Sequence, residues 1–209
     1  DKIPGTAHNL NTNVPVFQLP SLNNDSLRQL EANLNPDGPR RISQLIEVDV
    51  DFKNEATRDS VSGGNRVYRM KLNSPNATGL TLLFDEFYIA HGAELYIYDA
   101  DTTVIFGPFT NSFGSNGTFS IPPLWGGAAI IELLEPYFPT VASAIHLFRV
   151  GHVYEESGQS EGESSDCNNN VNCPIGAGWE NQKRAVVRLD IYEPNSAGYW
   201  GSGTMINNT

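Results

Sequence analysis

The sequence is poor in basic residues, in cysteine and in long hydrophobic runs. Only 13 Lys and Arg stand against 24 Asp and Glu, which gives a net charge of −11. Such an acidic chain repels phosphate, so nucleic-acid binding and docking to anionic membranes are excluded. No apolar run approaches the ~20 residues that a membrane-spanning helix needs. Two cysteines with no histidine nearby do not make a zinc shell, and nothing else in the sequence calls for a metal or a cofactor.

The two cysteines, Cys167 and Cys173, are separated by five residues. They can bridge each other in a small loop or pair with cysteines that this sequence does not contain. The chain starts at Asp1 with no apolar leader, as a secreted protein does after signal removal, so we expect an extracellular location. Four Asn-x-Ser/Thr sequons are candidates for glycosylation and agree with that route. They are Asn24, Asn76, Asn116 and Asn207.

Residues 1–39 are rich in Asn, Pro and Leu and predict an extended arm. Within the arm, Asn24, Asp25 and Ser26 precede leucines at helical spacing, which predicts one short capped helix. From residue 40 to 154 the apolar period changes to two, and turn residues separate eight or so short strands. This pattern predicts an all-β fold, a sandwich or jelly roll. The predicted strands are 42–50, 66–72, 80–87, 95–98, 104–106, 118–121, 128–134 and 145–153.

Residues 155–166 contain no apolar side chain and predict an acidic linker. After the linker, residues 184–191 and 199–206 predict two strands of a hairpin. A lone hairpin is marginal in water, so we expect it to belong to a larger body outside this sequence.

The segment 167–209 carries a family resemblance. It opens with a Cys-x5-Cys-Pro element (167–174) and a glycine turn, continues with Arg-Ala-Val-Val (184–187), and closes with Gly-Ser-Gly-Thr-Met-Ile-Asn-Asn-Thr (201–209). This order resembles the mature N-terminus of lysyl-endopeptidase-like proteases of the trypsin/chymotrypsin group. Residues 40–154 look like the N-terminal prosegment of the same family.

The resemblance implies a sandwich prodomain (40–154), a linker (155–166) and the first strands of a trypsin-like β-barrel (167–209). It implies that Cys167 and Cys173 each pair with a downstream cysteine. The expected partners are the rest of the protease domain and, for the full-length form, protein substrates. The function implied is the inactive (pro)region, or zymogen part, of a secreted serine endopeptidase.

Two features depart from that family. Gly201 stands where the family usually has a cysteine. No Lys or Arg lies between Arg149 and Lys183, so self-cleavage at lysine within the linker is excluded. The linker glutamates, Glu155, Glu156, Glu161 and Glu163, would suit a glutamate-specific protease instead. These departures keep an alternative open, in which the chain is a non-catalytic secreted module for binding or assembly.

No catalytic residue is identifiable in the sequence. None of the four histidines, His8, His91, His146 and His152, stands in an Ala-x-His-Cys setting, and no Gly-Asp-Ser-Gly occurs. Two acidic pairs are candidates for calcium ligands or for an acid and a base. Asp85 and Glu86 are neighbours in a predicted strand, and alternation places them on opposite faces. Asp99 and Asp101 lie in a predicted turn, where Asp is favoured because it caps the backbone. Trp125 and Trp200 were weighed as carbohydrate-stacking platforms, with core packing preferred.

Overall fold

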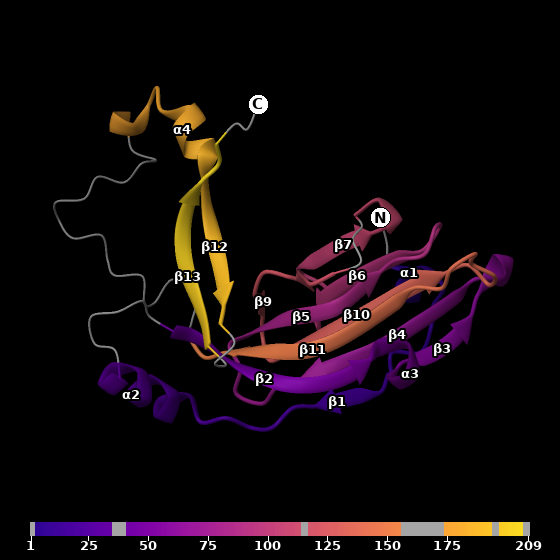
Figure 1. The fold of residues 1–209 in the computed structure, drawn as a ribbon. Helices are drawn as coiled ribbons and strands as arrows, with labels where there is room; N and C mark the ends of the chain where they lie inside the picture. Colours follow the sequence, from indigo (N-terminus) through magenta and orange to yellow (C-terminus); the bar gives the residue numbers. More distant parts are fainter. Residues whose placement is uncertain (1–2, 35–40, 114–116, 156–173, 194–196, 207–209) are drawn as a thin grey trace.

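A computed structural model describes residues 3–34, 41–113, 117–155, 174–193 and 197–206. Two β-sheets pack face to face, and a two-stranded hairpin projects from one end (Figure 1). The predicted all-β, sandwich-like fold is confirmed, and the described residues form no closed barrel. The predicted linker beyond Glu155, both cysteines, and the sequons at Asn116 and Asn207 lie outside the described residues, whereas Glu155 itself is buried.

One sheet has six strands, in the order β1-β4-β10-β6-β7, with β3 added beside β4. Pairing within this sheet is antiparallel except for β1, which runs parallel to β4. The strands are β1 (Val16–Gln18), β3 (Thr57–Ser60), β4 (Arg66–Asn73), β6 (Glu94–Asp99), β7 (Ile105–Phe109) and β10 (Ala128–Glu135).

The other sheet has seven strands, in the order β12-β13-β2-β11-β5-β8, with β9 added beside β5. All of its pairs are antiparallel. The strands are β2 (Arg41–Asp51), β5 (Gly79–Tyr88), β8 (Phe119–Ser120), β9 (Leu124–Trp125), β11 (Ala144–Val153), β12 (Val186–Tyr192) and β13 (Ala197–Thr204).

The inward faces of the two sheets form one hydrophobic core. Alternate residues of each strand point inward because successive side chains of a strand lie on opposite faces. The six-stranded sheet contributes Met70, Leu72, Leu95, Ile97, Ile131 and Leu133, and the seven-stranded sheet contributes Leu80, Leu82, Phe84, Leu147 and Val150. This rigid core fixes the sheet edges from which the rest of the chain is positioned.

The predicted arm helix is present as α2 (Asn24–Leu34). Asn23 Oδ1 accepts the N–H of Ser26 at 3.0 Å, so the cap lies one residue before the predicted one. Three short helices were not predicted: α1 (Pro4–Ala7), α3 (Phe52–Glu55) and α4 (Glu180–Ala185). Three 3-10 turns were also not predicted: η1 (Ser62–Gly64), η2 (Asn111–Phe113) and η3 (Pro174–Gly176). The predicted strands correspond to β2, β4–β8, β10 and β11, with β12 and β13 forming the hairpin. The short strands β1, β3 and β9 were missed.

Candidate functional site

The feature that sets this fold apart is the junction between the sandwich and the β12–β13 hairpin. Among the described residues, β13 pairs with the sandwich strand β2 through three residue pairs, Ala197 with Gln44, Gly198 with Ser43 and Tyr199 with Arg41. The two hairpin strands pair with each other over their full length, from Val186 to Tyr192. The base of the hairpin is therefore an edge strand of the seven-stranded sheet, while its upper part leaves the sandwich (Figure 1).

Small residues allow the base of the hairpin to approach the sheet closely. Ala197 is fully buried. A Cβ atom at Gly198 would lie 2.1 Å from Ser43 Oγ, which is far inside van der Waals contact. A side chain at position 198 therefore fits only if the Ser43 hydroxyl rotates away or the hairpin moves off β2.

Arg41 joins three elements at this junction. Its guanidinium Nε donates to Tyr199 Oη of the hairpin at 3.3 Å and lies 3.4 Å from Glu31 Oε2 of α2. Glu31 also accepts the backbone N–H of Arg41 at 3.3 Å. Tyr154 belongs to the same buried group, and burial raises its pKa to about 12. Arg41 of β2 thus links the arm helix α2, through Glu31, to the hairpin, through Tyr199.

Trp200 of the hairpin packs edge-on against Trp125 of β9, with ring centroids 6.3 Å apart. The Arg188 guanidinium lies over the Trp200 ring, 5.3 Å from the ring centroid. The two tryptophans weighed as stacking platforms therefore pack against each other, but both are half-buried and lie outside the hydrophobic core that the preferred interpretation expected.

The junction leaves two buried polar atoms without a hydrogen-bond partner among the described residues. They are Ser43 Oγ and Trp200 Nε1. Each such group costs roughly 1–3 kcal/mol relative to a hydrogen-bonded one. A contact of three residue pairs that leaves two polar atoms unpaired is a weak attachment compared with the long ladders of β11.

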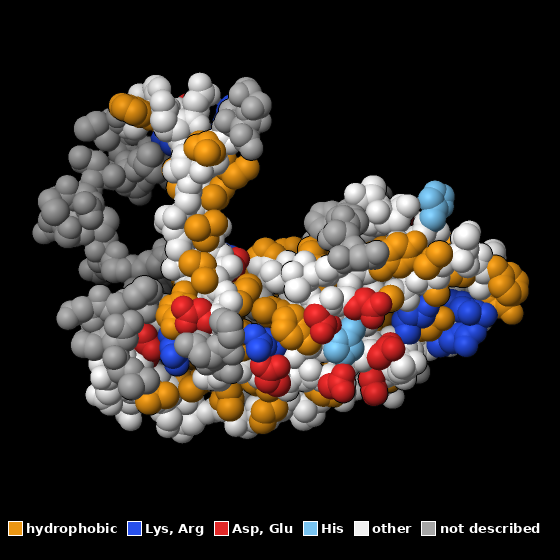
Figure 2. Space-filling view, in the orientation of Figure 1, with side chains coloured by type: hydrophobic (Ala, Val, Ile, Leu, Met, Phe, Trp, Pro, Cys, Tyr) orange, Lys and Arg blue, Asp and Glu red, His pale blue; other side chains and the backbone are white. Residues whose placement is uncertain are grey.

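The upper part of the hairpin exposes hydrophobic side chains, and Figure 2 shows them along the projecting strands. Val187, Leu189 and Ile191 alternate on one face of β12, and Leu189 and Ile191 are 43% and 44% exposed. Opposite them on β13 are Gly201 and Gly203, which leave these side chains uncovered. A face of this kind is typical of a strand pair whose second sheet or remaining barrel is missing.

Gly201, where the resembling family usually has a cysteine, belongs to this same face. A Cβ there would meet Ile191 Cδ1 at 3.3 Å and Leu189 Cβ at 3.7 Å. A side chain at this position would therefore point to the uncovered apolar side of the hairpin and away from the sandwich.

Asn24 and His152, both named in the sequence analysis, meet Ser74 beside the N-terminus of α2. His152 Nδ1 bonds with Ser74 Oγ at 2.8 Å, and His152 Nε2 bonds with Asn24 Oδ1 at 2.9 Å. Because the Asn24 oxygen can only accept, His152 carries its hydrogen on Nε2 and accepts the Ser74 hydroxyl at Nδ1. Burial lowers the pKa of His152, which keeps the ring neutral.

This Ser-His-Asn chain is not an active site. Ser74 and His152 are completely buried, so no substrate reaches the hydroxyl. The serine bonds to Nδ1, whereas in a protease triad the serine bonds to Nε2 and an acid bonds to Nδ1. The Asn24 amide also lacks the negative charge with which the acid of a Ser-His-Asp triad stabilises the imidazolium ion. The three side chains instead attach α2 to β11 and to the turn that follows β4.

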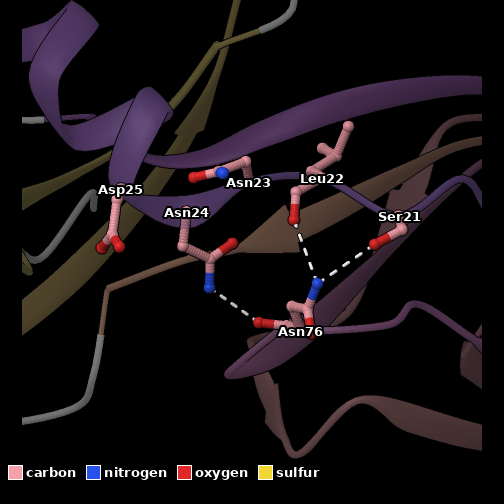
Figure 3. Close-up of a pocket in the computed structure, with 6 residues that line it drawn as sticks. All are labelled: Ser21, Leu22, Asn23, Asn24, Asp25 and Asn76. Atoms are coloured by element: carbon pink, nitrogen blue, oxygen red, sulfur yellow. Dashed lines mark hydrogen bonds between the residues drawn. The ribbon is translucent and has the colours of Figure 1, made fainter.

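Two of the four sequons meet in an open pocket at the same place (Figure 3). Asn24 Nδ2 donates to the backbone oxygen of Asn76 at 2.7 Å. Asn76 Nδ2 donates to Ser21 Oγ at 3.1 Å and to Leu22 O at 3.3 Å. Both amide nitrogens, the atoms that would carry a sugar, are thus already used as hydrogen-bond donors.

His146 is the one histidine placed between two carboxylates. Its Nδ1 lies 2.5 Å from Asp85 Oδ1 of β5, and its Nε2 lies 2.8 Å from Asp49 Oδ1 of β2. Hydrogen bonds to Asp85 and then Asp49 raise its pKa above the usual value. Figure 2 shows acidic side chains gathered over β2 and β11 in this region. The ion pairs tie together the three central strands on the outer face of the sheet.

The alternation argument for Asp85 and Glu86 was wrong. Both side chains are exposed, because the register between β5 and β11 shifts beside Asp85. A bulge of this kind places two successive residues on one face.

The turn interpretation of Asp99 is confirmed, since its carboxylate accepts from Thr103 Oγ1 and from the Val104 N–H at 3.0 Å. His91 and Asp101 are exposed in turns, and His8 is half-buried at the end of α1.

Within the described ranges, no group of three His, Cys, Asp or Glu side chains is arranged to hold a metal ion. The same ranges contain no helix with the length and apolar character required to cross a bilayer. The junction residues Arg41, Ser43 and Tyr199 were not found by sequence reasoning. The only signal for them is Ala-Gly at 197–198, which does not reveal the partner strand.

These features define an all-β, sandwich-like protein that carries an incompletely covered β-hairpin at one sheet edge. A family model described as the C-terminal domain of lysyl endopeptidase matches residues 161–209, the segment that contains α4, β12 and β13. This C-terminal segment is therefore similar to a protease-related family, the lysyl endopeptidases. The match lies on the hairpin segment and does not extend into the sandwich.

Proposed function

We propose that the chain is the precursor region of a secreted serine endopeptidase, in which the sandwich is the prosegment and the hairpin is the first part of the protease domain. The carrying observation is that the hairpin is attached to β2 by three residue pairs while its apolar face stays uncovered. The family match to residues 161–209 supports the protease relationship of that hairpin.

In this proposal the edge of β2 acts as a template for the protease domain. Pairing with β2, the Arg41 contact and the Trp125–Trp200 contact hold the base of the hairpin in an ordered shape. The apolar face of the hairpin then remains available to the strands that complete a barrel. The weak junction fits a contact that is made during folding and given up when the prosegment leaves.

The test uses the complete reading frame that contains this sequence. The proposal requires an Ala-x-His-Cys motif, a later Asp and a Gly-Asp-Ser-Gly beyond Thr209. In that full-length precursor, Trp125→Ala should lower the yield of active protease several-fold and leave kcat/KM of the mature enzyme unchanged. Tyr137→Ala, at an exposed aromatic residue away from the junction, is the matched control.

Absence of the catalytic motifs from the longer frame would refute the proposal. Equal yields of active enzyme from the Trp125 and Tyr137 variants would refute the template role while leaving the protease relationship in place.

Two observations favour a second candidate, a non-catalytic secreted module for binding or assembly. Gly201 removes the cysteine expected on the face that would meet the protease body, and no basic residue lies between Arg149 and Lys183 to permit release at lysine. This candidate requires that the chain around residues 155–166 stays intact in native material. A mass spectrum of the protein from its source would separate the two.

A further inference from the structure

A cavity of about 460 Å³ lies between the N-terminal segment, residues 3–14, and the outer face of the six-stranded sheet. α1 contacts β10 (Figure 1), and its residues Gly5 and Thr6 line one end of the cavity. At the other end, the Lys71 N–H of β4 donates to Pro15 O at 2.9 Å, where β1 begins to pair with β4. The segment is thus a cover fastened to the sheet at both ends.

Both carboxylate oxygens of Glu132, the acidic residue of this cavity, already accept hydrogen bonds. Glu132 is completely buried, and its Oε1 accepts the Gly5 N–H at 2.5 Å while its Oε2 accepts the Tyr98 hydroxyl at 2.9 Å. Burial raises the pKa of Glu132. Glu132 therefore holds the cover in place and leaves no oxygen without a donor for a cationic ligand.

The basic groups of the cavity have donors to spare. Arg69 and Lys71 are two residues apart on β4, so they share one face of the strand. Arg69 Nη2 bonds with Asp59 at 2.9 Å, but its Nε is buried without a partner. The Lys71 ammonium has no hydrogen bond or ion pair to any described residue. Of the two groups only Arg69 Nε is a buried donor without an acceptor, a rare situation for which a bound anion is one explanation, whereas Lys71 is half-buried.

The remaining walls are largely apolar. Ile3, Leu10 and Val14 contribute from the cover, and Ile130 contributes from β10. The size of the cavity is within the range of small-molecule sites, which are mostly apolar with a few fixed polar groups. Arg69 is paired with Asp59, so Lys71 is the cation of this cavity that a ligand carboxylate could neutralise.

We propose that this cavity binds a small monocarboxylic acid with an apolar body, either a free acid or the C-terminal residue of a peptide. The carboxylate accepts from Lys71 Nζ and Arg69 Nε, and the apolar body packs against Ile130 and the inner side of the cover. The site is separate from the hairpin junction and does not depend on the protease proposal.

The experiment titrates the whole 209-residue chain with N-acetyl-leucine and follows binding by calorimetry. The free acid should bind saturably, and the neutral N-acetyl-leucinamide should bind at least about tenfold more weakly, because charged hydrogen bonds are the strong ones. A short peptide that ends in leucine distinguishes the two sources. If it binds as well as the free acid, the natural ligand is a peptide terminus, and if it does not bind, the ligand is a free acid.

Lys71→Met should weaken binding of the acid at least about tenfold while it keeps the aliphatic stem. Arg58→Met is the matched control, since Arg58 is exposed on the neighbouring strand β3 and does not line the cavity. Ile130→Trp, which fills the cavity from its apolar wall, should abolish binding as a second variant. Equal binding of acid and amide, unchanged binding in Lys71→Met, or no saturable binding at millimolar concentration would overturn the proposal.

Discussion

Gly198 of β13 lies so close to Ser43 of β2 that a Cβ at position 198 would stand 2.1 Å from Ser43 Oγ. The two residues are register partners in the short ladder that attaches the hairpin to the sandwich. This single contact decides how near the two strands can come, and it leads directly to a test of the attachment.

Gly198→Val should detach the base of the hairpin from β2, because the added side chain cannot share the space of the Ser43 hydroxyl. The expected result is a change in tryptophan fluorescence as Trp200 leaves Trp125, with little loss in the unfolding temperature of the sandwich. Adding Ser43→Gly to the variant should restore part of the wild-type signal. Gly201→Ala is the control, since a Cβ there meets only side chains of the hairpin itself. An unchanged spectrum in Gly198→Val would contradict the account of this contact.

The stability of the sandwich should depend on His146 near neutral pH. The pKa of His146 is raised in the folded state by Asp85 and Asp49, so the folded protein holds its proton more tightly than the unfolded chain. This contribution is fully present below the unfolded pKa of about 6.5 and is lost as pH rises through the higher folded value. Asp51, Glu86 and the Glu47–Arg149 pair surround the ring and keep the local field negative.

The measurement is the free energy of unfolding in urea between about pH 5 and pH 9. His146→Gln should remove the loss on the alkaline side, whereas His91→Gln, at an exposed turn, should keep it. Identical pH profiles for the His146 variant and the parent would show that the ion pairs contribute nothing.

His152 should act in the opposite direction. Its pKa is lowered by burial, so the unfolded chain binds a proton more readily than the folded one. Its contribution is complete above about pH 6.5 and is lost as pH falls towards and through the lower folded pKa. His152→Gln should flatten the acid side of the stability profile. If the free energy of unfolding of this variant still falls as steeply below about pH 6.5 as that of the parent, groups other than His152 cause the fall.

Ser74 should be a structural residue and not a nucleophile. Ser74→Ala removes the buried hydrogen bond to His152 and should lower the free energy of unfolding by about 1–2 kcal/mol. The parent chain and the variant should both lack activity toward peptide esters. Turnover by the pure parent chain that disappears in Ser74→Ala would reverse this assignment.

The sandwich could be predicted from the sequence because its strands alternate clearly and turn residues separate them. The helix at Asn24–Leu34 followed from its capping residues and the spacing of its leucines. Other features depend on tertiary contacts that leave no local pattern. The parallel strand Val16–Gln18 is too short to show a period, and the bulge at Asp85 breaks the alternation on which the prediction relied.

The site could be predicted only in part, for the same reason. The hairpin was visible as two apolar runs, but its attachment depends on contacts between residues about 150 positions apart, such as Arg41 with Tyr199. The Ser74–His152–Asn24 chain joins three distant segments in the same way. Each residue alone looks unremarkable in the sequence.

The most direct test of the account is amide hydrogen exchange along β12 and β13 in the intact chain. The account predicts protected amides where residues 197–199 face β2 and much faster exchange in the upper hairpin around 187–189 and 201–203. Protection as strong throughout the hairpin as in β11 would show that both strands form an integral layer of the sandwich, and it would contradict the claim that the hairpin belongs to another domain.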